Sequence, residues 1–457
     1  MGRAMLLLVS GLVILSGIIQ YSNNRRAEIL PQETNEYYYE QQAKNISTSL
    51  IDNAIQNLFR DMEWTGSIDA DENFSGEGSL RMYNMGTSGL DTVENSVLEW
   101  DQYKVLIVSE GNYGGYESEI EVLLQRDSFS KFSYFTNEER LPNSNTQIFF
   151  STGDVLTGPI HSNGTFSMAG SPTFNGDVSS PNDWVGQSGD YDGATSEERH
   201  GSDTPQFNGT ANFDMATPRN LPGPEQIDDL KSAALSGGIT FDSDAELEFY
   251  VADDIGYVKE TDTEWQQECV WKGWWDCDWV EVVIGETSYN LADYNGLISV
   301  NGIAKVKGEV KGQVTLHATQ EIEIMGDIYY NQNPTADPDV VSNDLMGLVS
   351  EGNVIVDRYA HQDNGSSDLT IHASIMALDN AFTVENYSSG GNRGVLNILG
   401  GIIQKNRGPV GTFNSYGTAS GFSKNYIYDE RLLETIPPSF PRESIFTIVY
   451  WKERTSS

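Results

Sequence analysis

Basic residues are scarce in this chain. Its 457 residues include 27 lysines and arginines against 67 aspartates and glutamates, and the formal net charge at pH 7 is -40. Binding of nucleic-acid phosphates needs clustered Lys and Arg side chains, and the sequence shows no basic stripe. Nucleic acid is therefore excluded as an expected partner. An acidic surface of this kind favours solubility, cation binding or life in salt.

Cysteine is equally rare, with only Cys269 and Cys277. They bracket the segment VWKGWWD, whose centre (272–274) suits a three-residue hairpin loop with glycine near the left-handed position. Two thiols without a second pair or a nearby histidine fall short of the four ligands of a zinc site. We therefore predict a disulfide across the hairpin, formed in an oxidising compartment.

The common catalytic motifs are also missing. No GxSxG, HExxH or phosphate-binding loop occurs, and no Ser-His-Asp or Cys-His arrangement is readable. His161, His317 and His372 lie in segments of alternating apolar residues, which suits either a functional histidine ladder or half-buried, hydrogen-bonded histidines. We expect no enzyme, although the dispersed carboxylates of solenoid lyases and glycosidases would leave no motif.

One long apolar run is present at the N-terminus. No charged residue occurs from Ala4 to Asn24, and a helix of this length would cross most of a bilayer. Arg3 precedes the run, and Arg25 and Arg26 follow it, so the positive-inside rule leaves the orientation ambiguous. A cleaved signal peptide is an alternative, but no small-x-small cleavage site follows the run.

A second helical segment is expected after Pro31, which would kink or restart the helix. Apolar residues recur there at spacings of three and four, as on one helix face: Tyr39, Ala43, Ile46, Leu50, Ala54 and Leu58. Two strands, Tyr103 to Ser109 and Tyr116 to Gln125, are then joined by the turn GNYGG. The first helical segment suits lipid or copies of itself, and the second suits packing on a sheet.

This order of apolar helix, proline-bearing joint, amphipathic helix and sheet resembles a type IV pilin, and the N-terminus is most similar to the minor pilins. It departs at Met5, where most pilins have Glu. The resemblance implies insertion in the inner membrane before assembly, then a filament core shared with copies of itself or other pilins. The implied core residues are Met5, Leu6, Leu7, Leu8, Val9, Leu12, Val13, Ile14, Leu15, Ile18 and Ile19. A plain membrane anchor with a juxtamembrane helix is the alternative.

Short runs of alternating apolar residues, ending in Gly, Asn or Asp, dominate residues 148–179 and 297–403. Strands this short with glycine corners are typical of stacked β-coils, which together bury an interior that one coil cannot bury. The predicted fold is therefore mainly β with one long N-terminal α-helix. We expect a pilin-like helix-plus-sheet domain followed by a β-solenoid domain with an inserted subdomain.

Several motifs in the second half resemble an uncharacterised bacterial family that has a pilin-like N-terminus and a polymer-like β-solenoid. They are TGPIHSNG (157–164), DLMGLVSEGNVIV (344–356), IHASIMA (371–377), GGIIQKNRGPVG (400–411) and NYIYDERL (425–432), with PPSFP after it. The resemblance implies surface assembly and supplies no catalytic residues.

The expected divisions follow these patterns. They are a transmembrane or filament-core helix (1–30), a pilin-like helix and sheet (31–140), a β-solenoid (145–180 and 296–432), an insertion (181–295) and a C-terminal Pro-rich segment with a strand (433–457). Within the insertion, Pro222 and Pro224 mark the start of a short helix, and Gly237 and Gly238 mark its end.

Tryptophans crowd the cysteine hairpin, at Trp265, Trp271, Trp274, Trp275 and Trp279. A disulfide-linked projection rich in tryptophan would stack on surface glycans or anchor a protein partner. Alternatively, some of these tryptophans pack down onto the solenoid and fill space.

Calcium is the one cofactor for which the sequence offers ligands. The spacing of Asp69, Asp71 and Asn73 matches the first, third and fifth positions of a calcium-binding loop. Phe74 replaces the glycine that such a loop needs, and Leu80 replaces its final glutamate. Two further clusters fit solvated turns: Asp190 with Asp192, and Asp242 with Asp244 and Glu246.

We thus expect a structural subunit, or a minor or tip component, of an extracellular type IV pilus-like filament that mediates surface assembly and adhesion. One alternative is a membrane-anchored β-solenoid that binds or cleaves carbohydrate, which would need a groove lined by carboxylates and aromatic side chains. The other is a membrane-anchored adhesin that never polymerises.

Overall fold

The computed structural model describes residues 2–62, 64, 66, 76–84, 103–271, 275–335, 341–363, 365–414 and 417–456. The chain forms two compact units. Unit 1 comprises Met1–Asp127 and Ile445–Ser457, and unit 2 comprises Ser128–Ser444. Strands dominate unit 2, as the sequence predicts, whereas the 59-residue helix α1 is the largest element of unit 1. The C-terminal segment of the chain belongs to the same unit as the N-terminus.

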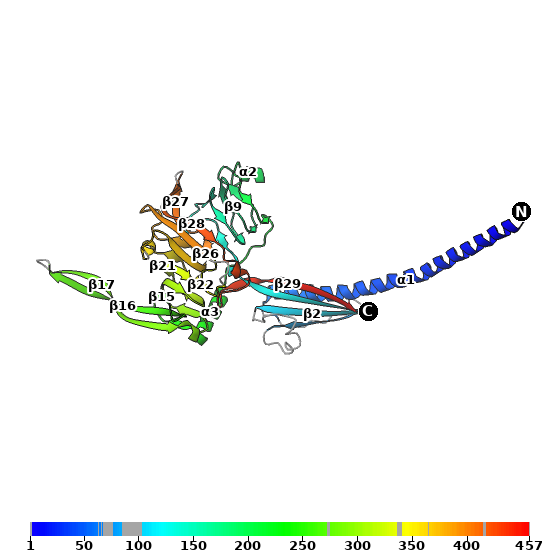
Figure 1. Ribbon diagram of the computed structural model, residues 1–457, viewed down its shortest axis with the longest axis horizontal. Coiled ribbons are helices and arrows are strands. Elements are labelled where there is room, and N and C mark those ends of the chain that lie inside the picture. Colours follow the sequence, from blue (N-terminus) through cyan, green and yellow to red (C-terminus); the bar gives the residue numbers. More distant parts are fainter. Residues whose placement is uncertain are drawn as a thin grey trace. The chain divides into compact units, whose positions relative to one another are not determined.

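Unit 1 contains one helix and one antiparallel sheet (Figure 1). Helix α1 (Gly2–Arg60) continues through Pro31 and does not restart there. The strands are β1 (Glu77–Tyr83), β2 (Lys104–Tyr113), β3 (Tyr116–Ser128) and β29 (Arg442–Ser456), in the order β1-β2-β3-β29. Gly114 and Gly115 connect β2 and β3 with positive φ angles of 63° and 88°, which suits a two-residue hairpin turn. The predicted hairpin is confirmed.

The predicted apolar stripe of α1 packs on this sheet. Ala43, Ile46, Leu50, Ala54 and Leu58 are all buried, together with side chains from β2 and β3 that include Ile107, Ile120 and Val122. The helical periodicity in the sequence therefore identified the buried face correctly.

A glycine and three serines bring helix and sheet close together. A Cβ atom on Gly111 would lie 2.3 Å from the Ala43 carbonyl oxygen and 2.9 Å from the Ser47 nitrogen. The buried Ser47 hydroxyl lies 3.1 Å from that of Ser118, and the Ser109 hydroxyl donates to the Ser47 carbonyl at 3.0 Å. Small side chains thus allow the contact, and hydrogen bonds satisfy its buried polar atoms.

Unit 2 begins with short strands that pair only in parallel. They are β4 (Tyr134–Glu138), β5 (Phe150–Ser151), β6 (Val155–Leu156), β7 (Ile160–Ser162), β8 (Ser167–Ala169), β9 (Thr173–Phe174), β10 (Val178–Ser179), β11 (Val185–Gly186), β12 (Gln206–Phe207) and β13 (Ala211–Asn212), with η4 (Phe129–Lys131) before them and α2 (Ser196–His200) before β12. They form the ladders β4-β7-β10-β13, β5-β8-β11 and β6-β9-β12. His161 and Ser179, on the paired strands β7 and β10, are 18 residues apart.

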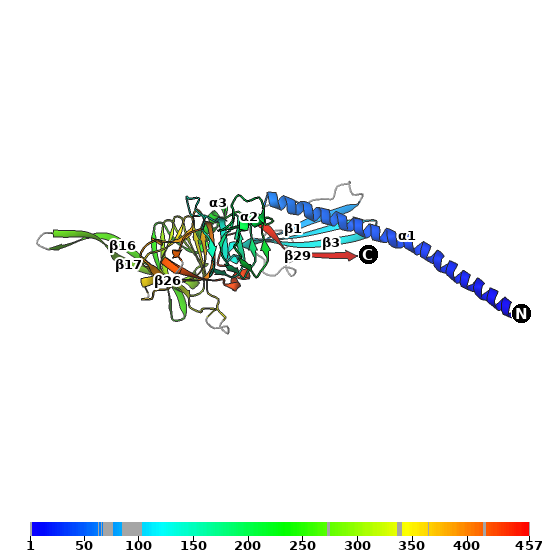
Figure 2. The ribbon, with the colours of Figure 1, turned by 90° about the horizontal axis from the view of Figure 1, so that it is seen from above.

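The rest of unit 2 forms a second run of coils. Its elements are α3 (Pro224–Gly237), β14 (Ile239–Phe241), β15 (Ala245–Ala252), β16 (Ile255–Trp271), β17 (Trp275–Asn290), η5 (Leu291–Asp293), β18 (Leu297–Val300), β19 (Ala304–Val310), β20 (Gln313–Ala318), β21 (Ile322–Tyr330), β22 (Leu345–Ser350), β23 (Val354–Val356), η6 (Ala360–Gln362), β24 (Leu369–Ala377), β25 (Phe382–Val384), β26 (Asn392–Asn406), β27 (Gly411–Asn414), β28 (Gly417–Ile427) and η7 (Glu430–Leu433). The strands β14-β18-β20-β22-β24-β26 form one parallel ladder around a buried apolar interior (Figure 2).

The two runs of coils join into one ladder. Strand β26 pairs in parallel with β4, so that Ile402 lies opposite Tyr134 although the two are far apart in sequence. Helix α3 covers one side of the join, where Ile227 and Leu230 pack with Ile403. The helix begins with Pro224 in its first turn and ends at Gly237, as the sequence predicts.

We expect Gly111→Ala to destabilise unit 1 by about 1–3 kcal/mol, because the new methyl group collides with the backbone of α1. Chemical denaturation, followed through hydrogen exchange of β2, measures this loss. The control is Gln56→Ala, at an exposed position of α1 in the same unit, which should change stability by less than about 0.5 kcal/mol. Equal effects of both substitutions would contradict the close-contact account.

Candidate functional site

The N-terminal half of α1 presents apolar side chains to solvent. Ile18 is 61% exposed, Ile19 is 54% exposed and Tyr21 is 69% exposed. The side chains of the other predicted core residues, Met5 to Leu15, lie outside the part of the chain that the structure describes. In the described part, no helix combines the length and apolarity needed to cross a membrane.

The long hairpin β16–β17 projects from unit 2 (Figures 1 and 2). The predicted disulfide between Cys269 and Cys277 is present, and the two residues lie directly opposite each other with a Cα–Cα distance of 4.0 Å. Trp271 pairs with Trp275, which leaves residues 272–274 as the connecting loop. The disulfide therefore links the two strands near the outer end of the projection, in addition to their antiparallel pairing.

Tryptophans accompany this disulfide on one face of the hairpin. Trp275, Cys277 and Trp279 alternate along β17, so they share a face. Trp275 is 66% exposed and Trp279 is 64% exposed, so neither packs down on the coils. Trp274 and the side chains of Trp265 and Trp271 lie outside the described part.

Carboxylates lie elsewhere on the same two strands, where Asp262, Glu264, Glu268 and Glu286 are exposed. Because Glu268 pairs with Asp278 while Cys269 pairs with Cys277, Glu268 points to the face opposite the disulfide and the tryptophans. The projection thus offers an exposed aromatic face, which suits a partner with an apolar patch.

The three histidines singled out in the sequence are buried and hydrogen-bonded. His161 Nδ1 lies 2.8 Å from the Ser179 hydroxyl, and His317 Nδ1 lies 3.0 Å from the Ser299 hydroxyl. His372 Nδ1 accepts from the Tyr330 backbone nitrogen at 3.1 Å. Burial lowers the pKa of each histidine to about 4. They are neutral members of the ladder and do not form a row of adjacent histidines.

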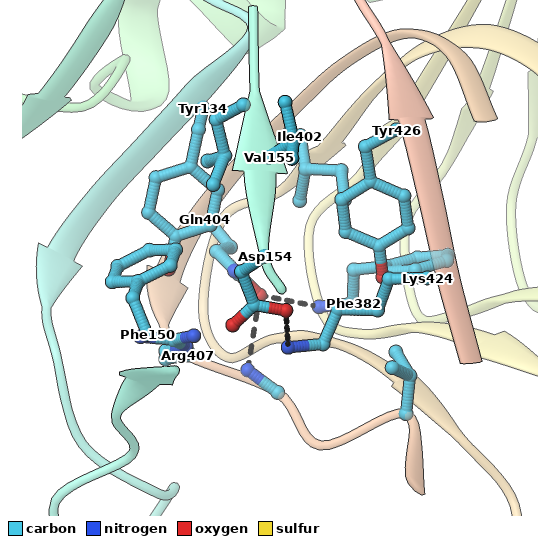
Figure 3. A pocket seen from close by; sticks show the side chains of 13 residues that line it. Tyr134, Phe150, Asp154, Val155, Phe382, Ile402, Gln404, Arg407, Lys424 and Tyr426 are labelled. Carbon is cyan, nitrogen blue, oxygen red and sulfur yellow. Dashed lines mark hydrogen bonds and ion pairs between the residues drawn. The ribbon is translucent and has the colours of Figure 1, made fainter. Parts of the chain in front are cut away.

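A small polar pocket lies where the two runs of coils join (Figure 3). The Arg407 guanidinium binds the Glu139 carboxylate at 3.1 Å and lies 3.7 Å from the centre of the Phe150 ring. Lys424 pairs with Asp154 at 3.3 Å, and burial lowers the pKa of the lysine. The cavity measures only about 50 Å³. Its paired charges therefore hold the join together and leave no room for a substrate.

The predicted calcium residues Asp69, Asp71 and Asn73 lie outside the described residues. Among the residues that the structure does describe, no group of three or more His, Cys, Asp or Glu side chains is arranged to hold a metal. In the two further acidic clusters, Asp190 accepts a hydrogen bond from the Asp192 nitrogen within its own turn at 3.0 Å, whereas Asp244 accepts one from the nitrogen of Ile303, 59 residues away, at 2.8 Å.

Comparisons with known proteins add the following. Residues 104–182 match a domain of unknown function, DUF4900. Among curated proteins, none matches the chain. A solved structure with similarity is the competence-associated pilin ComZ from Thermus thermophilus, at 12% sequence identity and a TM-score of 0.32, over 92% of this chain and 98% of that one.

Replacing both Cys269 and Cys277 with serine should loosen the projection without unfolding unit 2. The disulfide closes a short loop and so lowers the conformational entropy of the unfolded hairpin, which stabilises the folded hairpin by about 2.5 kcal/mol. Hydrogen exchange of peptides from β16 and β17 should accelerate, while exchange in β20 and β21 stays unchanged. Unchanged exchange in the projection would show that the disulfide does not hold it.

Acid should destabilise the chain partly through the buried histidines. Because burial lowers their pKa from 6.5 to about 4, the unfolded chain binds protons first as the pH falls, and unfolding becomes easier between pH 6.5 and 4. His317→Gln should make the pH dependence of the unfolding free energy shallower by up to about 1.4 kcal/mol per pH unit in that window. Val384→Ala is the control, since it removes buried apolar atoms without changing a titratable group and should leave the slope unchanged. Identical slopes for the wild-type chain and His317→Gln would contradict this account.

Proposed function

We propose that this protein is a structural subunit, or a minor or tip component, of a type IV pilus-like filament on the cell surface. The observation that carries the proposal is the division of α1 into two halves. Ala43 to Leu58 supplies a stripe that is buried on the sheet of unit 1, whereas Ile18 and Ile19 are exposed in the preceding half. An exposed apolar helix in water needs a second partner.

Copies of the same helix satisfy that need. The chain is held in the inner membrane by its apolar run before assembly, and the run then passes into a filament core where neighbouring helices bury one another's apolar side chains. Unit 2 occupies the outside of the filament as a β-solenoid of stacked coils. The net charge of -40 keeps this exterior soluble.

Adhesion is the second part of the proposal, and it rests on the β16–β17 projection. Trp275 and Trp279 are exposed beside the Cys269–Cys277 disulfide, and large aromatic side chains in exposed positions commonly anchor a binding partner. A membrane-anchored adhesin that never polymerises would use the same projection. The two functions differ in whether α1 contacts lipid or other helices.

Ile18→Lys should prevent incorporation into filaments, because a lysine ammonium group in a packed apolar core is costly to bury. The measurement is the amount of chain in material sheared from the cell surface, relative to the amount left in the membrane fraction. Gln20→Lys, at an exposed polar position on the opposite face of the same helix, is the matched control and should retain incorporation. Normal incorporation of Ile18→Lys would contradict burial of this residue in the filament.

A further inference from the structure

A large polar groove crosses unit 2 where β4 ends. It has a volume of about 750 Å³, and its lining comes from the end of β4, the following loop and three later turns. A neighbouring hollow of about 490 Å³ shares Glu138, Arg140 and Asn145 with it. Together they are called the amide groove below.

Amide side chains dominate the amide groove. They are Asn137, Asn145, Gln147, Asn163 and Asn182 in the larger part, and Asn143, Asn380 and Asn406 in the smaller part. An amide has both donors and an acceptor, which match a hydroxyl group that also donates and accepts. The Asn163 amide is already used by His161, Asn137 and Arg219, so the other amides would bind the ligand.

Hydrogen bonds hold part of this lining in place. The Asn163 amide donates to Asn137 Oδ1 at 2.9 Å, and the Asn182 amide donates to the Asn163 carbonyl at 2.9 Å. Arg140 donates to Asn145 Oδ1 at 3.2 Å. Side chains fixed before binding lose less entropy when a ligand arrives.

The charges in the amide groove are paired with one another. Glu138 binds Arg140 at 3.1 Å, and Asp379 binds Lys405 at 2.8 Å. The third carboxylate, Glu139, is buried and pairs with Arg407 at 3.1 Å. In a chain with a net charge of -40, these pairs make the groove locally neutral. A neutral ligand is therefore favoured over an anionic one, which the remaining surface would repel.

One aromatic ring completes the lining. Tyr191 borders the larger part of the groove and is 50% exposed. The apolar face of a sugar ring packs against an exposed aromatic ring, while its hydroxyl groups form hydrogen bonds with amides. We propose that the amide groove binds a neutral oligosaccharide. This inference is independent of filament assembly and of the tryptophan projection.

The test uses the full chain in dodecyldimethylamine oxide, a detergent without a sugar headgroup. Isothermal titration calorimetry measures the binding of cellohexaose, chitohexaose and maltohexaose, with hexagalacturonate as the anionic comparison. At least one neutral hexasaccharide should bind with a dissociation constant below about 10 mM. Hexagalacturonate should bind more weakly than that neutral sugar.

The variants locate the binding. Tyr191→Ala and Asn145→Ala, both at exposed positions, should each weaken binding by about tenfold or more. Tyr359→Ala removes a tyrosine that is 56% exposed outside the groove and should leave affinity within about twofold.

The proposal is wrong if none of the three neutral hexasaccharides binds, or if hexagalacturonate binds more tightly than all of them. It is also wrong if Tyr191→Ala and Asn145→Ala both leave the binding of the neutral sugar unchanged. Loss of binding in the double variant Trp275→Ala and Trp279→Ala, with none in Tyr191→Ala, would place the sugar on the projection and likewise reject the amide groove.

Discussion

Burial of one face of α1 on the sheet of unit 1 is the interaction on which the account depends. The contact is close because Gly111 has no side chain and because Ser47, Ser109 and Ser118 satisfy one another's polar atoms or the backbone. It fixes the second half of the helix, whereas Ile18 and Ile19 in the first half are exposed. In the function that we propose, these exposed side chains are buried by association with other helices.

Unit 2 depends on a different constraint, the continuity of its parallel ladder. Pairing of β26 with β4 joins the two sets of strands into one ladder, and the buried pair Arg407–Glu139 and the half-buried pair Lys424–Asp154 lie at that join. Replacing one residue of the buried pair with an uncharged one would leave the other charge buried and unpaired. The β16–β17 projection extends from unit 2, and the amide groove lies where β4 ends.

Local patterns made some of these features predictable and left others hidden. Four features follow from residues that are close in sequence. Helical spacing indicates the buried stripe of α1, and turn glycines indicate the β2–β3 hairpin. Prolines and glycines at its ends indicate the bounds of α3, and the short loop indicates the Cys269–Cys277 disulfide. Pairing of β26 with β4 and the return of β29 to unit 1 carry no such signal, because their partners are far apart in sequence. The amide groove was missed for the same reason, since Asn137, Asn182 and Asn380 come together only in the fold.

The central claim is that α1 assembles with other helices in a surface filament. Its most direct test is electron microscopy of material sheared from the cell surface, with immunogold labelling of unit 2 and mass spectrometry of the subunit's N-terminus. The account predicts labelled filaments whose subunits retain the apolar run containing Ile18 and Ile19. Single labelled copies that remain with the membrane fraction, without filaments, would contradict it.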